Sequence, residues 1–188
     1  GRAGRAVSGA ISLTLAIVFV CVAAGVFIEE MLGLFIFMGG MLALAFLHTT
    51  GNARRPTRET WSSWLLAIAS AGSCLYFVLM YDVHKDRLPV LDPLSSTDVA
   101  VSILLIALVL EATRRCIGIV LVVLVSMFLL YAGLGDKLAG AFSHRGMSVP
   151  EMIDQLVFTN NGLYGPALEV AAYLVFIFVV FGALLDRF

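Results

Sequence analysis

The sequence has few charged residues and few cysteines, and both shortages limit what the protein does. Only 13% of the residues are charged and the net charge is -1, so no basic surface supports binding to nucleic acid. Cys21, Cys74 and Cys116 lie in separate apolar runs without CxxC spacing, which favours buried side chains over a disulfide or a zinc site. No nucleophile with a base, no metal-ligand spacing and no phosphate loop is present. We therefore expect no enzyme activity, no catalytic, cofactor-binding or metal-binding residue and no cofactor in this chain.

Apolar residues dominate instead. They make up 61% of the chain and the mean hydropathy is +1.00, whereas about 45 to 50% is usual in soluble domains. Apolar stretches of transmembrane length recur, and none shows the period of two of a barrel strand. The sequence thus predicts an all-α, polytopic helical membrane protein with about six transmembrane helices. The predicted spans are 7–28, 31–47, 61–81, 97–112, 116–134 and 167–185.

One further helix is predicted to lie on the membrane surface. Ser148 and Glu151 have the spacing of a capping box, and apolar residues then recur at the helical period. Asp154 and Gln155 join Glu151 on the opposite side. We therefore expect an interfacial amphipathic helix at 149–159.

The distribution of basic residues predicts the orientation in the membrane. With a cytoplasmic N-terminus, the cytoplasmic side holds Arg2, Arg5, Arg54, Arg55, Arg58, Arg114, Arg115 and Arg187. The outer side then holds Lys85, Arg87, Lys137 and Arg145. This excess of basic residues on one side follows the positive-inside rule and predicts that both termini are cytoplasmic.

A short polar segment, 111–115, interrupts the apolar run 99–134. As one helix that run would be roughly 54 Å long, which exceeds a bilayer core of about 30 Å, so the segment is expected at a membrane surface. Glu111 precedes Arg114 and Arg115 by three and four residues, the spacing of helical ion pairs. Two guanidiniums can bind an anion, but we favour an anchor with an internal ion pair.

Two turn motifs near the C-terminal end are also candidates. Asn160-Asn161-Gly162 and Gly165-Pro166 fit either a cavity-facing, unwound segment that holds ions or an ordinary capped turn, which we favour. Glu169 follows in the first turn of the last predicted span. It is either a functional intramembrane carboxylate or a charge that suits the helix dipole, and both interpretations stay open.

From 110 to 188, ordered motifs resemble one transporter family. They are Leu110-Glu111-Ala112-Thr113-Arg114-Arg115 with Gly118, Phe128-Leu129-Leu130-Tyr131, His144-Arg145-Gly146, Thr159 with Gly162, Tyr164-Gly165 and Phe181-Gly182-Ala183-Leu184-Leu185. This order resembles the fused permeases of tripartite ATP-independent periplasmic (TRAP) transporters of the TAXI type. Upstream, the likeness to the family's four-helix small subunit rests on topology and on Ala45-Phe46-Leu47.

The resemblance implies a function and a division of the chain. Residues 1–113 would be a four-helix scaffold, and 114–188 the first two helices of the large permease subunit with an amphipathic arm. The complete system would import an organic acid or similar solute across the bacterial or archaeal inner membrane. Sodium would drive the import, and the sodium-binding and substrate-binding residues are expected after Phe188.

The resemblance also implies partners. They are membrane lipid, the remainder of the large permease subunit and a periplasmic substrate-binding protein. On the acidic outer face, Asp82, Asp86 and Asp92 are candidates for docking that binding protein. The alternative is a stand-alone structural membrane protein that assembles with or stabilises another membrane complex.

Overall fold

The computed structural model describes residues 9–18, 29–51, 58–87, 92–137 and 143–186, and all regular structure in these ranges is helical. Five helices there are long and apolar enough to cross a membrane. They are α2 (Glu30–Gly51), α3 (Arg58–Leu79), α5 (Ser96–Cys116), α6 (Ile119–Leu134, continued by η1, Gly135–Lys137) and the helix Pro166–Leu185. The last consists of α8 (Pro166–Val170), a π-helical turn η3 (Ala171–Val175) and α9 (Phe176–Leu185). The predicted polytopic helical fold is confirmed.

The first predicted span is described only in part. A short apolar helix covers Gly9–Val18, and the rest of the stretch 7–28 lies outside the described residues. Arg2, Arg5, Arg54, Arg55 and Arg187, which enter the predicted orientation, also lie outside them.

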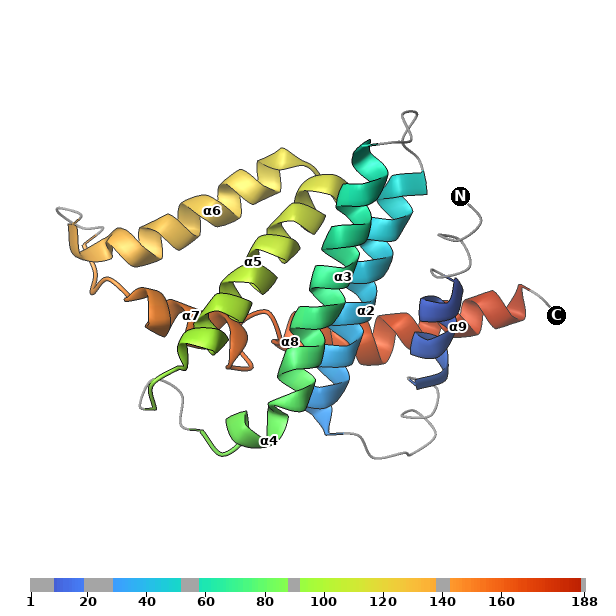
Figure 1. Cartoon of the computed structure of the whole chain (residues 1–188), viewed down its shortest axis with the longest axis horizontal. Helices are drawn as coiled ribbons and strands as arrows, with labels where there is room; N and C mark the ends of the chain where they lie inside the picture. The colour runs from blue at the N-terminus through green and yellow to red at the C-terminus, as the bar shows by residue number, and fades with distance from the viewer. Residues whose placement is uncertain (1–8, 19–28, 52–57, 88–91, 138–142, 187–188) are drawn as a thin grey trace.

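Three helices form the centre of the molecule. In Figure 1, α2, α3 and α5 run between its top and bottom in alternating directions. One end, which we call the Glu111 end, holds the end of α2, the start of α3 and the junction of α5 with α6. The other, which we call the α4 end, holds the start of α2, the short helix α4 (Tyr81–His84) and the start of α5. This alternation agrees with the predicted placement of the connections between the first spans.

Two glycines of α2 let neighbouring helices approach closely. A Cβ atom added at Gly39 would lie 2.7 Å from the Cβ of Cys74 on α3. One added at Gly40 would lie 2.7 Å from a methyl group of Leu15 on the first helix. Small residues allow such contacts between membrane helices. Gly39 and Gly40 therefore let α2 pack closely against α3 and the first helix.

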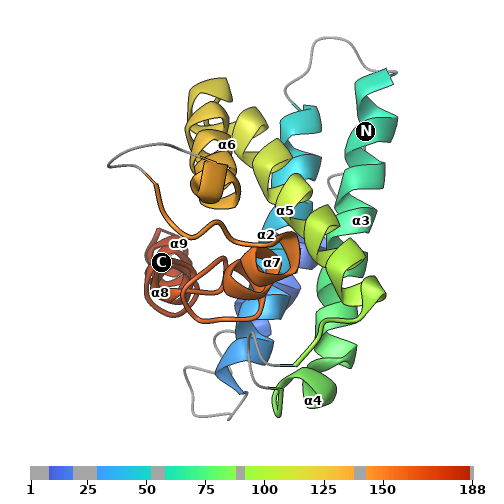
Figure 2. The same ribbon diagram turned by 90° about the vertical axis from the view of Figure 1, so that its left-hand side faces the viewer.

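The last two membrane-length helices are far less covered than α2. Half of the α2 span is buried, but only 6% of Ile119–Lys137 and 6% of Pro166–Leu185. Figures 1 and 2 show α8 and α9 running across the bundle, although the sequence predicts a span alongside the others. The contacts between this helix and α2 include Phe176 on Phe37, with ring centroids 5.5 Å apart, and Tyr173, which lies directly on Gly33.

The amphipathic helix is present as α7 (Val149–Val157), and its N-terminus has the predicted capping box. The Ser148 N–H donates to the Glu151 carboxylate at 2.8 Å, and the Glu151 N–H donates to Ser148 Oγ at 3.4 Å. The predicted polar face was wrong in one respect, because Asp154 is only 1% exposed. Long-range pairing with Arg87 holds that carboxylate inside the molecule, so α7 packs into the bundle beside α5.

Candidate functional site

The Glu111 end holds the predicted ion-pair cluster. The Arg114 Nε donates to Glu111 Oε2 at 2.7 Å and its Nη2 to Oε1 at 2.8 Å, a bidentate pair. The Arg115 Nε donates to the same Oε1 at 2.7 Å. One helical turn therefore brings both guanidiniums onto the carboxylate, as the sequence predicts.

Arg115 extends this cluster to two other helices. Its Nη1 donates to Ser63 Oγ on α3 at 2.9 Å, and its guanidinium lies 5.6 Å from the ring centre of Phe46 on α2. Because the arginine donors are directed to Glu111 and Ser63, the arrangement favours an anchor between helices over an anion-binding site. The cluster joins the end of α5 to the hairpin of α2 and α3.

A second polar cluster lies at the α4 end and begins with Asp98. This residue stands in the first turn of α5, where Ser95 is the N-cap, and it is 8% exposed. Its carboxylate accepts a hydrogen bond from the Tyr76 hydroxyl at 2.6 Å and one from the Ser95 N–H at 3.2 Å. His84 Nε2 lies 3.2 Å from Asp98 Oδ1. Asp98 thus connects α3, α4 and α5.

Beside it, Arg87 and Asp154 form a buried ion pair. Arg87 Nη1 lies 2.7 Å from Asp154 Oδ1, and the two side chains are 12% and 2% exposed. Arg87 also donates from Nε and Nη2 to the backbone carbonyl of Asp92, at 3.2 and 2.8 Å. The pair therefore attaches α7 to the connection between α4 and α5.

Phe158 lies between the two parts of this cluster. The His84 ring stacks on it with centroids 4.9 Å apart, and the Arg87 guanidinium lies 5.4 Å from its centre. We call the whole group the α4-end clasp, and its members are Tyr76, His84, Arg87, Asp98, Asp154 and Phe158. It links α3, α4 and α5 to α7, which follows α6 in the chain.

Sequence reasoning missed most of the clasp. Ser95 and Asp98 have capping-box spacing, which predicts that the Asp98 carboxylate accepts a hydrogen bond from the backbone at the start of the helix. The spacing does not predict the contacts of Asp98 with Tyr76 and His84. Arg87 and Asp154 are 67 positions apart, and no local pattern connects them. The histidines are scattered along the sequence and gave no signal.

The three docking candidates lie at the same end. Asp82 pairs with Lys85 at 2.7 Å, and this hydrogen bond raises the pKa of the lysine. Asp86 and Asp92 are exposed. A hydrogen bond with the Glu29 side chain raises the pKa of Tyr81, so the start of α2 also contributes acidic charge here. The structure therefore places the predicted acidic residues on one end of the molecule.

The two turn motifs form a hydrogen-bonded connection between α7 and α8. The Leu163 N–H donates to the Leu156 carbonyl at 2.7 Å, and the Gly165 N–H donates to the Gly162 carbonyl at 3.1 Å. Tyr164 between them is 1% exposed and packs edge-on against Phe35 of α2, with ring centroids 4.6 Å apart. This geometry is that of the capped turn which the sequence favours. Asn160 and Asn161 are exposed at its outer side.

Glu169 lies in the first turn of α8, as predicted. Its carboxyl group lies close to that of Glu30 at the start of α2. The Tyr173 hydroxyl donates to the Glu30 backbone carbonyl at 3.2 Å. The Tyr173 contact therefore holds the start of this last helix beside the start of α2.

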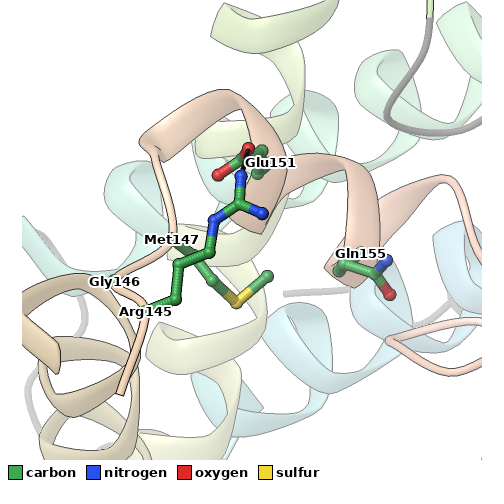
Figure 3. A pocket seen from close by; sticks show the side chains of 5 residues that line it. All are labelled: Arg145, Gly146, Met147, Glu151 and Gln155. Atoms are coloured by element: carbon green, nitrogen blue, oxygen red, sulfur yellow. Dashed lines mark ion pairs between the residues drawn. The ribbon is translucent and has the colours of Figure 1, made fainter. Parts of the chain in front are cut away.

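A surface hollow lies next to α7. Its volume is about 220 Å³, and it is lined by Arg145, Gly146, Met147, Glu151 and Gln155. Figure 3 shows Arg145 directed toward Glu151, and their charged atoms are 3.5 Å apart. The hydrogen bond from the Ser148 backbone lowers the pKa of Glu151, so its carboxylate is charged near neutral pH. The hollow is smaller than the pockets that usually hold organic ligands, and none of the predicted site residues lines it.

Within the described ranges, no group of three or more His, Cys, Asp or Glu side chains is placed to hold a metal ion. Comparisons with protein-family models, with curated proteins and with solved structures find no match for this chain.

Proposed function

We propose that this chain is the scaffold-forming part of a TRAP transporter of the TAXI type. In the complete system, a periplasmic binding protein hands over an organic acid or similar solute, and sodium drives its import. The chain itself contributes a fixed framework and the first two helices of the large subunit. The proposed location is the inner membrane, with both termini in the cytoplasm.

One observation carries this proposal: α6 and Pro166–Leu185 are apolar along their length but almost uncovered. Phe128 and Phe178 are 61% and 69% exposed, although half of the α2 span is buried. We infer that further membrane helices of the same transporter cover these surfaces, with lipid on the remainder.

The two polar clusters support a static role. The Glu111 cluster fixes α5 to α2 and α3 at one end, and the α4-end clasp fixes α5 to α3, α4 and α7 at the other. Helices that are joined at both ends keep their relative positions. A framework of this kind suits the fixed part against which a transport domain moves.

Solute uptake tests this function. Membrane vesicles from cells that express the complete system, with its binding protein, are expected to accumulate labelled organic acid only under an inward sodium gradient. Deleting this chain should abolish the accumulation, and restoring it should recover the activity. Full uptake without the chain, or without sodium, would contradict the proposal and favour the stand-alone structural role.

Charge reversal tests the docking face. In Asp86→Lys/Asp92→Lys we expect uptake at low concentrations of the binding protein to fall by roughly tenfold, because complementary charge steers protein association. The loss should shrink at high concentrations of the binding protein. Asp186→Lys, a reversal at the end of α9, is the matched control and should transport normally. Unchanged uptake and unchanged binding would remove this face from the docking model.

A further inference from the structure

The His84 ring lies between two hydrogen-bond acceptors. Its Nδ1 is 2.7 Å from the Met80 backbone carbonyl, and its Nε2 is 3.2 Å from Asp98 Oδ1. A neutral imidazole has one N–H and can donate to only one of them, so its other nitrogen would direct a lone pair at an oxygen. The protonated ring donates to both acceptors. The observed arrangement therefore suits the imidazolium form.

The groups around His84 show why a proton on its ring is important for the contact with Asp98. Among the described contacts of Asp98, Tyr76 and Ser95 are neutral donors, and His84 brings the positive charge. Arg87 lies on the same Phe158 ring but directs its charge to Asp154 on α7. The remaining ionisable groups nearby are Asp82, Lys85 and Asp86 next to His84 in the chain, and Tyr81 with its partner Glu29. Lys85 pairs with Asp82, so it does not replace His84 at Asp98.

We propose that His84 and Asp98 form a proton-binding latch. With a proton on His84, the ion pair holds α4 against the start of α5, and the stacked ring holds it against Phe158 at the end of α7. Loss of the proton removes the charge attraction and leaves one ring nitrogen facing an acceptor, which releases α4. Because a histidine side chain can gain and lose a proton, the contact between α4 and α5 depends on pH.

The direction of the pH effect follows because the contact with Asp98 needs the protonated form of His84. The contact stabilises the folded chain most at low pH, where His84 is charged, and the stabilisation is lost as pH rises. The segment that moves carries Asp82 and Asp86 as well. The latch would therefore change the shape of the acidic α4 end, whichever side of the membrane that end faces.

A double-mutant cycle on the purified full chain in detergent tests the latch. Thermal unfolding of the unaltered chain, His84→Gln, Asp98→Asn and the double variant is measured at about pH 5.5 and about pH 8.5. We expect a coupling between the two positions of roughly 4 °C at the lower pH and below about 1 °C at the higher pH. His48→Gln, an exposed histidine on α2, is the matched control and should show no such pH dependence. Equal coupling at both pH values, or none at the lower one, would overturn the proposal.

Hydrogen exchange gives a second readout that needs no variant. The amides of His84 and Lys85 donate to the carbonyls of Met80 and Tyr81. After correction for the intrinsic pH dependence, their protection should fall by about tenfold or more between the two pH values. Protection of the α2 amides should stay constant. Equal protection of the α4 amides at both pH values would also overturn the latch.

Discussion

Replacing Arg87 by alanine is expected to destabilise the chain by about 3 to 5 kcal/mol, the loss typical of removing one partner from a buried ion pair. The reason is that the Asp154 side chain, only 2% exposed, would lose its ion pair with Arg87. Phe158 would also lose the guanidinium on its face. Thermal or denaturant unfolding of the purified full chain measures the loss.

Two further variants separate the ion pair from other effects of the substitution. Arg87→Ala/Asp154→Asn should recover a substantial part of the lost stability, because the buried charge is removed together with its partner. Lys85→Ala breaks an exposed pair in the same segment and should have little effect. Equal losses for Arg87→Ala and Lys85→Ala would contradict the central place of the α4-end clasp.

Gly162→Ala is expected to cost about 1 to 3 kcal/mol of stability. A Cβ atom at this position would overlap the backbone carbonyl of Leu156, and this carbonyl also accepts the Leu163 N–H at 2.7 Å. Backbone atoms cannot move aside as the end of a flexible side chain can. The substitution should therefore open the turn and loosen Tyr164 from its place against Phe35.

The control is Gly72→Ala on α3. A Cβ there meets nothing within 4 Å, and alanine favours a helix, so this variant should be neutral or slightly more stable. Unfolding of both variants is compared under the same conditions. If Gly162→Ala proved as stable as Gly72→Ala, the tight turn between α7 and α8 would not be important to the fold.

Features set by local spacing could be predicted from the sequence. Runs of apolar residues gave the helices, and the three-residue and four-residue offsets from Glu111 gave its contacts with Arg114 and Arg115. The same holds for the capping box formed by Ser148 and Glu151. Each depends on a pattern of residues within one or two helical turns.

Features that depend on long-range contacts could not be predicted. Asp154 follows the polar period of α7, yet an arginine 67 positions earlier in the chain makes it a buried residue. His84 on α4 and Asp98 on α5 meet across the connection between these two helices. The direction in which the helix Pro166–Leu185 crosses the bundle could not be predicted from its composition either. A helix that is apolar on all sides can pack against its neighbours in several directions.

Photocross-linking from the two uncovered helices tests the scaffold proposal most directly. A photoreactive phenylalanine analogue is placed at Phe128 on α6, at Phe178 on α9 and, for comparison, at exposed Ile68 on α3. In membranes containing the complete system, we predict that Phe128 and Phe178 cross-link to further helices of the transporter's large subunit, identified by mass spectrometry, with mainly lipid adducts at Ile68. Lipid adducts alone at both phenylalanine positions would contradict the account.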